Sequence, residues 1–377
     1  SATPTMDPAW PITSMLAVAT TDRVLMGPGP CNPYPEAVAA LGRPMLGHLD
    51  PDFLALLDDL NGRLRTVFQT VNPLTFPLSG TGSAGMEAAL VNTLEPGDTA
   101  VVGINGVFGM RLAEVARRCG AGVVAVEFEW GTPVDPERLL AAHPNPKVVA
   151  VVHAETSTGA RTDLAPFGAA KGDALLLADV VTSVGGIELA IDDWGVDLAY
   201  AGTQKCLGVA PGLAPMTFSD RAREHFVADP RSWYLDVGMI ADYVQAEGGR
   251  SYHHTAPISM LFSLHAGLGA VLDEGLDGAI DRHQQCGRAL QDGLEAMGLE
   301  LFAAEGHRLP QLTTVWVPDG VEDAAVRSNL LQRYGIEIGG GLGAYAGRVW
   351  RIGCMGHTAR MRNVRLVLAA LAEALGR

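Results

Sequence analysis

A series of short apolar runs, separated by segments with helical periodicity, constrains the fold of this chain more than any other feature. The runs extend over residues 74–78, 100–104, 122–128, 147–153, 174–180, 196–201 and 213–218. Strands that alternate with helices predict an α/β fold with a mostly parallel sheet covered by helices. Because such sheets bind ligands at the carboxyl ends of their strands, we expect the polar residues that follow these runs to form the functional site.

The C-terminal part of the chain has a mixed pattern instead. An apolar, periodic segment over residues 257–280 predicts one long helix, and further strands are expected at 312–317 and 347–352, with helices at 324–334 and 359–375. The glycine run at 339–341 predicts a flexible loop ahead of Arg351. We therefore expect an irregular N-terminal arm over residues 1–22, a large domain over 23–282 and a smaller α+β domain over 283–377.

Composition excludes several classes of function. The 377 residues carry a net charge of −15, which argues against nucleic acid or an anionic membrane as a partner. An anionic ligand must then be held by local positive groups. The five cysteines are scattered and form no CxxC pair, so we expect neither disulfides nor a zinc site, and a cytoplasmic location. The N-terminus lacks the pattern of a signal peptide, and no apolar run approaches the roughly 18 residues of a membrane span.

A glycine-rich loop follows the first apolar run and precedes a predicted helix. Gly80, Gly82 and Gly85 match the G-x-G-x-x-G pattern of dinucleotide-binding proteins. That interpretation is weak, because the next strand ends in Asn105 and Gly106, where an acidic residue would be needed for the ribose. The more general inference is that the helix N-terminus binds a phosphate through its backbone amides. The alternative is a close-packed turn without a ligand.

An acid and a lysine follow two later runs. Asp179 comes after the apolar residues 174–178, and Lys205 comes after the run at 196–201 and its glycine-containing turn. This pair is what a pyridoxal phosphate enzyme needs: the lysine amine forms a Schiff base with the cofactor, and the acid keeps the pyridine nitrogen protonated. The alternatives are a surface lysine and a carboxylate that caps the next helix or loop.

Three further residues fit the same hypothesis. Val181 and Phe108 could pack on the two faces of a pyridine ring, although either could simply belong to the core. Residues 153–158 form a polar cluster directly after a buried strand, and the Thr156 hydroxyl could reach the phenolic oxygen of the cofactor. Loop capping is the alternative for this cluster.

Arg351 stands in an apolar strand, where a guanidinium needs a carboxylate partner. A substrate carboxylate bound by the planar fork of the guanidinium is one such partner, and an internal salt bridge is the other. The adjacent pair His253 and His254 does not predict a metal site, because neighbouring side chains of an extended chain diverge and no third ligand stands nearby.

Several of these motifs occur together in one family. The sequence resembles the class V aminotransferases, and in particular the alanine–glyoxylate and serine–glyoxylate (serine–pyruvate) aminotransferases, over about residues 22 to 375. The motifs that carry the resemblance are SGTGS at 79–83, HAETSTG at 153–159, Asp179, GTQK at 202–205, YHHT at 252–255 and RIG at 351–353.

The resemblance implies a fold-type I, pyridoxal phosphate-dependent transaminase that forms a homodimer with shared active sites. Lys205 would form the internal aldimine, Asp179 would bind the pyridine nitrogen, and Arg351 with Gly29 would bind the substrate. The other cofactor residues that it implies are Thr81, Gly82, Ser83 and Gln204 at the phosphate, Thr156 at the phenolic oxygen, Phe108 and Val181 on the ring, and Tyr252 and Thr255 reaching the phosphate of the partner subunit. Phe108 and Ser83 depart from the vertebrate pattern, which has tryptophan and histidine there.

The activity implied is transfer of the amino group of alanine or serine to glyoxylate or pyruvate. One alternative is another class V reaction such as cysteine desulfuration, for which Cys354 is the nearest candidate nucleophile, although it stands at the end of an apolar strand. The other is a nicotinamide-dependent dehydrogenase that uses the loop at 80–85.

Overall fold

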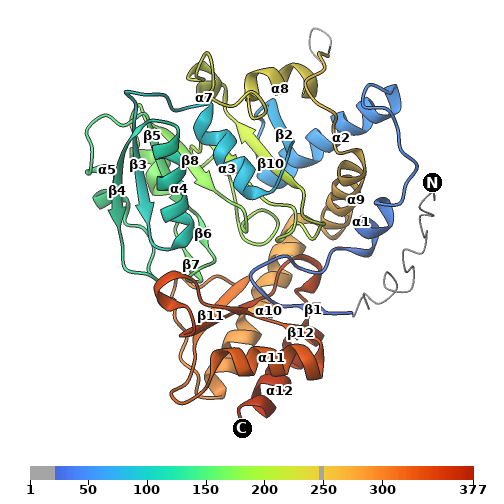
Figure 1. Ribbon diagram of the computed structural model, residues 1–377, viewed down its shortest axis with the longest axis vertical. Coiled ribbons are helices and arrows are strands. Elements are labelled where there is room, and N and C mark those ends of the chain that lie inside the picture. The colour runs from blue at the N-terminus through green and yellow to red at the C-terminus, as the bar shows by residue number, and fades with distance from the viewer. Residues whose placement is uncertain (1–21, 246–249) are drawn as a thin grey trace, which may run out of the picture.

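The computed structural model of the chain describes residues 22–245 and 250–377 (Figure 1). The expected N-terminal arm, residues 1–22, lies outside the described part except for Asp22. In Figure 1 a large part built around a sheet lies above a smaller part, coloured orange to red, in which the chain ends. No helix within the two described ranges is both long and apolar enough to span a lipid bilayer.

The central sheet of the large part has seven strands. Their order across the sheet is β2 (Leu74–Ser79), β10 (Leu213–Phe218), β9 (Leu198–Tyr200), β8 (Leu175–Asp179), β5 (Val148–Val152), β3 (Thr99–Ile104) and β4 (Gly122–Glu127). All neighbours are parallel except that β10 runs antiparallel to both β2 and β9. The prediction of a mostly parallel sheet is confirmed, and all seven apolar runs belong to it.

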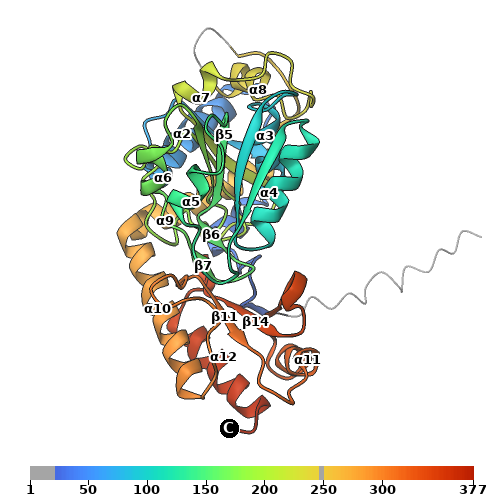
Figure 2. The same cartoon turned by 90° about the vertical axis from the view of Figure 1, so that its left-hand side faces the viewer.

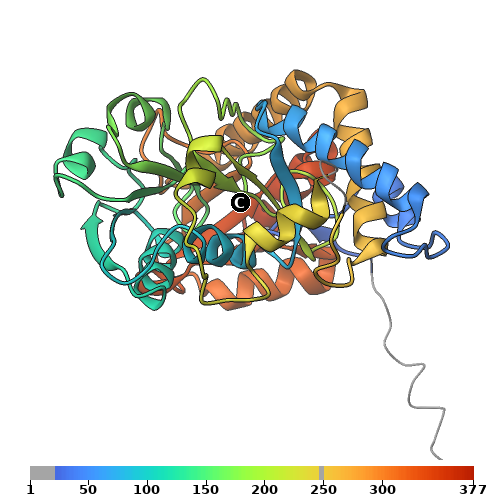
Figure 3. The same ribbon diagram turned by 90° about the horizontal axis from the view of Figure 1, so that it is seen from above.

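Helices cover both faces of this sheet. Figures 2 and 3 show α3 (Gly82–Val91) and α4 (Val107–Arg118) on one face and α2 (Pro51–Phe68) and α6 (Ala165–Ala170) on the other. Every residue of β5, β8, β9 and β10 is buried, which follows from this double cover. The large part also contains α1 (Pro35–Ala40), α5 (Pro136–Leu140), α7 (Asp220–Glu224), α8 (Val237–Val244) and α9 (Ile258–Glu274).

Two helices show how local sequence sets their ends. Helix α2 begins at Pro51, directly after its N-cap residue Asp50. The Asp50 side chain accepts a hydrogen bond from the Asp52 amide at 2.9 Å. The expectation of one long helix over residues 257–280 is wrong. Gly275, with φ at 82°, separates α9 from α10 (Leu276–Ala296), because a residue with positive φ cannot continue a right-handed helix.

The smaller part has its own hydrophobic cluster, formed by α10, α11 (Asp323–Tyr334), α12 (Met361–Ala374) and the sheet β11 (Leu312–Trp316), β14 (Val349–Gly353), β13 (Gly339–Gly340). The start of the chain packs here, since β1 (Val24–Leu25) pairs with β12 (Ile336–Glu337). The glycine run at 339–341 is not simply the expected loop: Gly339 and Gly340 form an edge strand that pairs with Arg351 and Trp350. The short elements are β6 (Ala154–Glu155), β7 (Ala160–Arg161) and the 3-10 turns η2 (Gly343–Tyr345) and η3 (Gly356–Thr358).

Candidate active site

The carboxyl ends of five strands surround one cavity of about 160 Å³. Strand β2 leads into α3, β3 leads into α4, β5 leads into the loop at 153–158, and β8 and β9 end side by side at Asp179 and Tyr200. All the expected cofactor residues except Tyr252 and Thr255 line the cavity. Its walls are Thr81, Gly82, Ser83, Met86, Phe108, Arg111, Ala154, Thr156, Asp179, Val181, Thr182, Tyr200, Gln204 and Lys205.

Asp179 is a buried acid whose hydrogen bonds, among the described residues, come from neutral donors. Its Oδ1 accepts a hydrogen bond from the Val181 amide at 3.0 Å, and its Oδ2 accepts one from the Tyr200 hydroxyl at 2.8 Å. Burial raises the pKa of Asp179 to about 6, although these hydrogen bonds and the charge of Lys205 act in the opposite direction. A carboxylate desolvated in this way gains strongly from a cationic N–H, such as a protonated pyridine nitrogen.

Lys205 lies in the turn after β9, at the same edge of the sheet. Burial, assisted by the charge of Arg351, lowers the pKa of Lys205 to about 8, although Cys206 and Asp179 act in the opposite direction. An amine with such a pKa is partly neutral near neutral pH, so it can act as a nucleophile or a base.

Gly29 packs directly against Lys205. The lysine amine donates a hydrogen bond to the Pro28 carbonyl, and a Cβ on Gly29 would lie 2.5 Å from Nζ of Lys205. The φ of Gly29 is 102°, a conformation that residues with side chains rarely adopt. A side chain at this position would therefore strain the backbone and displace the Lys205 side chain.

The start of α3 forms part of the cavity wall and fits a phosphate group. Helix α3 begins at Gly82. Thr81, the residue before it, forms no side-chain capping bond, and the first turn has no acidic residue, so the first amides and the positive dipole end are available to an anion. Gln204 also lines the cavity, and its side-chain NH₂ is a donor that a phosphate can accept from. Together with Asp179 and Lys205, these groups match the phosphate, the ring nitrogen and the aldehyde of pyridoxal phosphate.

Phe108 and Val181 both line the cavity. Phe108 stands in the first turn of α4, and its amide donates a hydrogen bond to Oε2 of Glu155 at 3.0 Å. Thr156, which is 3% exposed, lies in the same loop as Glu155 and also faces the cavity. This arrangement is compatible with the expected positions of these side chains around a pyridine ring.

Arg351, in β14 of the smaller part, reaches the loop that carries Thr156. Its Nε donates to the Gly340 carbonyl at 2.7 Å and its Nη1 to the Thr156 carbonyl at 3.3 Å. No carboxylate of the described residues forms an ion pair with it, and burial lowers the pKa of Arg351 to about 10 despite the opposing charge of Glu155. A buried guanidinium held only by carbonyls is suited to bind a substrate carboxylate.

Tyr252 and Thr255 do not reach the cavity of their own chain. Both are exposed, Tyr252 by 54%, and the Tyr252 hydroxyl lies 3.3 Å from Oγ1 of Thr255. Within one chain, the structure thus separates these two residues from the others of the expected set.

Two residues that line the cavity, Tyr200 and Arg111, were not predicted from the sequence. Tyr200 reads as the last apolar residue of a strand, yet its hydroxyl binds Asp179; burial and the adjacent carboxylate raise its pKa well above the ordinary value. Arg111 donates to the Ser83 hydroxyl at 3.3 Å and stands 5.1 Å from the centre of the Phe108 ring. Among the described residues that line the cavity, it is the one cation besides Lys205. The spacing of Phe108 and Arg111, one helical turn apart, was the available signal.

A comparison with protein families shows to which family the chain belongs. The model of the family described as aminotransferase class-V matches residues 31–360. The chain belongs to the class V aminotransferases. It is therefore a pyridoxal phosphate-dependent transaminase with the α/β architecture of fold type I.

Known class V relatives match this chain along nearly its whole length. It is 38% identical to the (S)-ureidoglycine–glyoxylate transaminase of Bacillus subtilis, covering 95% of this chain and 92% of that one. It is 42% identical to the alanine–glyoxylate aminotransferase of Callithrix jacchus, covering 94% and 87%. The crystal structure of the alanine–glyoxylate aminotransferase of Nostoc sp. superposes with a TM-score of 0.92 at 44% identity, covering 95% and 97%.

Neither alternative function finds comparable support. The solved structure of a cysteine desulfurase from Thermococcus onnurineus shares only 13% identity with the transaminase, a likeness that shows the fold alone. Cys354 is completely buried, and burial raises its pKa far above the ordinary value, so it cannot serve as an exposed nucleophile. The dehydrogenase alternative needs an acid at the end of β3 to bind a ribose. Asn105 stands there instead, and its side-chain NH₂ donates to the Thr132 carbonyl.

Proposed function

We propose that this transaminase moves the amino group of alanine or serine to glyoxylate or pyruvate. The relatives named for glyoxylate support this acceptor. The observation that carries the proposal is the position of Arg351, a buried guanidinium without a carboxylate partner among the described residues, at the loop that lines the cofactor cavity. Alanine, serine, glyoxylate and pyruvate are small and share a carboxylate for it to bind.

Pyridoxal phosphate supplies an aldehyde that receives the amino group and a ring that takes up electrons from the substrate Cα. On the protein side, the α3 amides behind Thr81, with Ser83 and Gln204, would hold its phosphate. Asp179 would keep a proton on the ring nitrogen. Phe108 and Val181 would pack on the two ring faces and exclude water.

Lys205 has two roles in this proposal. Its amine holds the cofactor at rest, and the pKa near 8 keeps part of the amine neutral for that purpose. During turnover the same Nζ would accept the proton from the substrate Cα and later give it up again, so Lys205 would act as the base and then as the acid. Arg351 fixes the substrate carboxylate, so that the Cα–H bond is held towards Lys205.

The proposal is tested by spectroscopy combined with a donor and acceptor panel. The purified protein should show a visible absorbance band that borohydride bleaches, and the reduced cofactor should be found on the peptide that contains Lys205. With glyoxylate as acceptor, alanine and serine are compared with (S)-ureidoglycine, and glycine formation is measured. Lys205→Ala should abolish turnover but retain some bound cofactor, because the phosphate site is separate from the amine. Full activity of that variant would refute the mechanism.

A homodimer with shared active sites is part of the proposal. Tyr252 and Thr255 lie outside their own cavity, next to an exposed aromatic surface that includes Trp233 (59% exposed) and Tyr234 (44%). Both rings pack on the same segment: Trp233 stacks on His253 with ring centroids 4.4 Å apart, and Tyr234 lies tilted against His254. Exposed aromatic clusters of this kind are typical of interfaces. A second copy of the chain would cover them and receive Tyr252 and Thr255 at its phosphate site.

We also propose a cytoplasmic location. All five cysteines are free and buried, which is compatible with a reducing compartment. Fractionation of the source cells with an activity assay tests it.

A further inference from the structure

Glu155, at the end of β6, is a fully buried carboxylate that the proposed reaction does not use. Its two oxygens accept four hydrogen bonds. Oε2 accepts from the amides of Phe108 at 3.0 Å and Gly109 at 3.2 Å. Oε1 accepts from the amide of Ser157 at 3.0 Å and from its hydroxyl at 2.5 Å. All four partners are donors, so each of the two positions must hold an acceptor, as a carboxylate does, for all four hydrogen bonds to form.

These bonds hold the first turn of α4. A helix begins with amides that lack partners within the helix, and they are usually bound by a capping side chain. The residue before α4 is Gly106, which has no side chain to cap with. Instead, Glu155 binds the amides of Phe108 and Gly109, and the Ser157 hydroxyl accepts from the Val107 amide at 2.9 Å. The negative charge also interacts favourably with the positive end of the helix.

The packing leaves no room for another arrangement. A Cβ on Gly106 would lie 2.4 Å from Cδ of Glu155 and 2.4 Å from Oγ of Ser157. The carboxylate therefore fills the space against the backbone that leads into α4, and the position of the helix start follows the position of Glu155.

The same short loop reaches the substrate side. The carbonyl of Thr156, next to Glu155, accepts the hydrogen bond from Arg351. Burial raises the pKa of Glu155 to about 7; the hydrogen bonds from Ser157 and Gly109 oppose this shift, and the charge of Asp179 adds to it. The charge of Glu155 also favours the protonated state of Arg351.

We propose that Glu155 is a positioning residue: its buried carboxylate fixes the first turn of α4, and thereby sets the Phe108 ring over the cofactor while its loop holds Arg351. The inference rests on the proposed role of Phe108. It predicts that a change at Glu155 disturbs the cofactor site without touching cofactor or substrate.

The first test is hydrogen exchange of the cofactor-free protein. In Glu155→Gln, an amide NH₂ must face either the Phe108 and Gly109 amides or Ser157, so one pair of bonds is lost. We expect amides 107–109 to exchange about tenfold faster or more, since hydrogen bonds to a charged group contribute about 1.5–3 kcal/mol. Ser157→Ala removes only the hydroxyl, so it should accelerate exchange of the Val107 amide by a smaller factor. This variant replaces Glu155→Gln in the test if Glu155→Gln does not fold.

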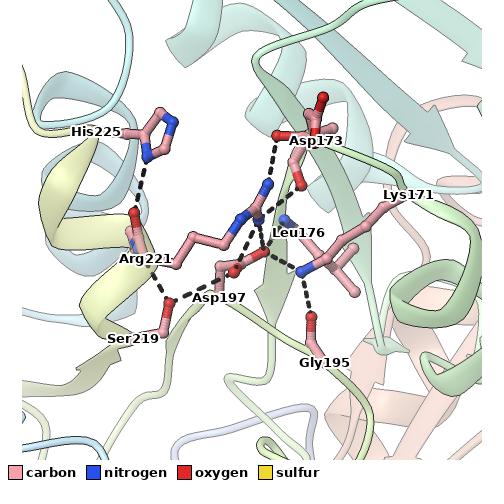
Figure 4. Close-up of polar contacts among 10 residues, drawn as sticks. Lys171, Asp173, Leu176, Gly195, Asp197, Ser219, Arg221 and His225 are labelled. Carbon is pink, nitrogen blue, oxygen red and sulfur yellow. Dashed lines mark hydrogen bonds and ion pairs between the residues drawn. The ribbon is translucent and has the colours of Figure 1, made fainter.

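Asp197→Asn is the matched control. Asp197 is also a buried carboxylate with several donors, but it precedes β9 at the opposite edge of the sheet. Figure 4 shows Lys171 and Arg221 converging on it, and the Leu176 amide donates to it at 2.7 Å. Its loss should lower the unfolding temperature without a selective change at amides 107–109.

The second test uses the protein with cofactor. Glu155→Gln should weaken pyridoxal phosphate binding about tenfold and reduce the visible circular dichroism of the bound cofactor, which reports the ring's asymmetric surroundings. Asp197→Asn should keep the wild-type dichroism. Glu155→Asp, which retains the charge but is shorter, should lie between wild type and Glu155→Gln.

The outcomes separate the inference from the proposed function. If Lys205→Ala abolishes turnover while Glu155→Gln behaves like Asp197→Asn in both tests, the positioning role is overturned and the proposed function stands. If Lys205→Ala retains turnover, the proposed function fails, and exchange at amides 107–109 still decides whether Glu155 holds α4.

Discussion

Asp179→Asn should make the cofactor-free protein more stable at alkaline pH, while it destroys catalysis. In the folded chain the carboxylate is 4% exposed and receives only two neutral hydrogen bonds. Burial raises its pKa from 3.8 to about 6. Ionised Asp179 therefore destabilises the folded state until a cation binds, and the neutral amide removes this penalty.

The size of the effect follows from the pKa. A rise from 3.8 to about 6 corresponds to roughly 3 kcal/mol, since each pKa unit is worth about 1.4 kcal/mol. The amide still accepts the Val181 bond, but its NH₂ no longer accepts from the Tyr200 hydroxyl, a loss of about 1 kcal/mol. We expect the variant to gain about 2 kcal/mol in free energy of unfolding at pH 8.

The gain should depend on pH in a defined direction. Because the folded pKa lies above the unfolded one, the folded state binds more protons between pH 3.8 and about 6. The wild-type penalty is then fully present above about pH 6 and disappears as the pH falls towards 3.8. The advantage of Asp179→Asn should shrink accordingly.

Urea unfolding of the two cofactor-free proteins at pH 8, 6.5 and 5, followed by tryptophan fluorescence, measures this difference. Asp197→Asn is the control, because Asp197 is paired with Lys171 and Arg221 and its loss should destabilise. With cofactor bound, Asp179→Asn should lose several orders of magnitude in kcat. A variant that is less stable at pH 8, or a difference independent of pH, would refute the picture of a desolvated charge that awaits the pyridine nitrogen.

Three further predictions concern the substrate, the lysine and the dimer. Arg351→Ala should raise KM for amino and keto acids about 10- to 100-fold with cofactor uptake intact, and Arg351→Lys should recover only part; an unfolded Arg351→Ala would indicate a structural role. Gly29→Ala places a Cβ against Lys205, so it should lower kcat with little change in the cofactor phosphate site, and wild-type kinetics would contradict this. Mixing Lys205→Ala chains with Tyr252→Phe/Thr255→Ala chains should raise activity above the parental average, because one site of each mixed dimer has no defect; no rise would mean that the sites are not shared.

The position of the site could be predicted from the sequence. Strands β5, β8 and β10 are buried between two helical layers, and this burial is visible in the sequence as continuous apolar runs; β4, at the end of the strand order, is partly exposed. In a parallel sheet, the residues after neighbouring runs lie at one edge. Asp179 and Lys205 therefore meet although they are distant in the chain, and the glycine-rich loop joins them by the same rule.

The direction of β10 and the break at Gly275 could not be predicted in this way. A fully buried run reads alike in either orientation, so only the chain path shows that β10 is antiparallel. Helical periodicity continues across Gly275, and only its backbone angle separates α9 from α10.

The tertiary structure alone decided how the site residues are held. Tyr200 reads as an apolar strand residue and Glu155 as a member of a polar loop, and their partners become visible only when β8 lies beside β9 and α4 begins beside the 153–158 loop. Strand and helix periodicity are local properties of a sequence. The two hydrogen bonds, by contrast, join residues that are separated by 21 and by 47 positions in the chain, so they depend on how whole elements pack.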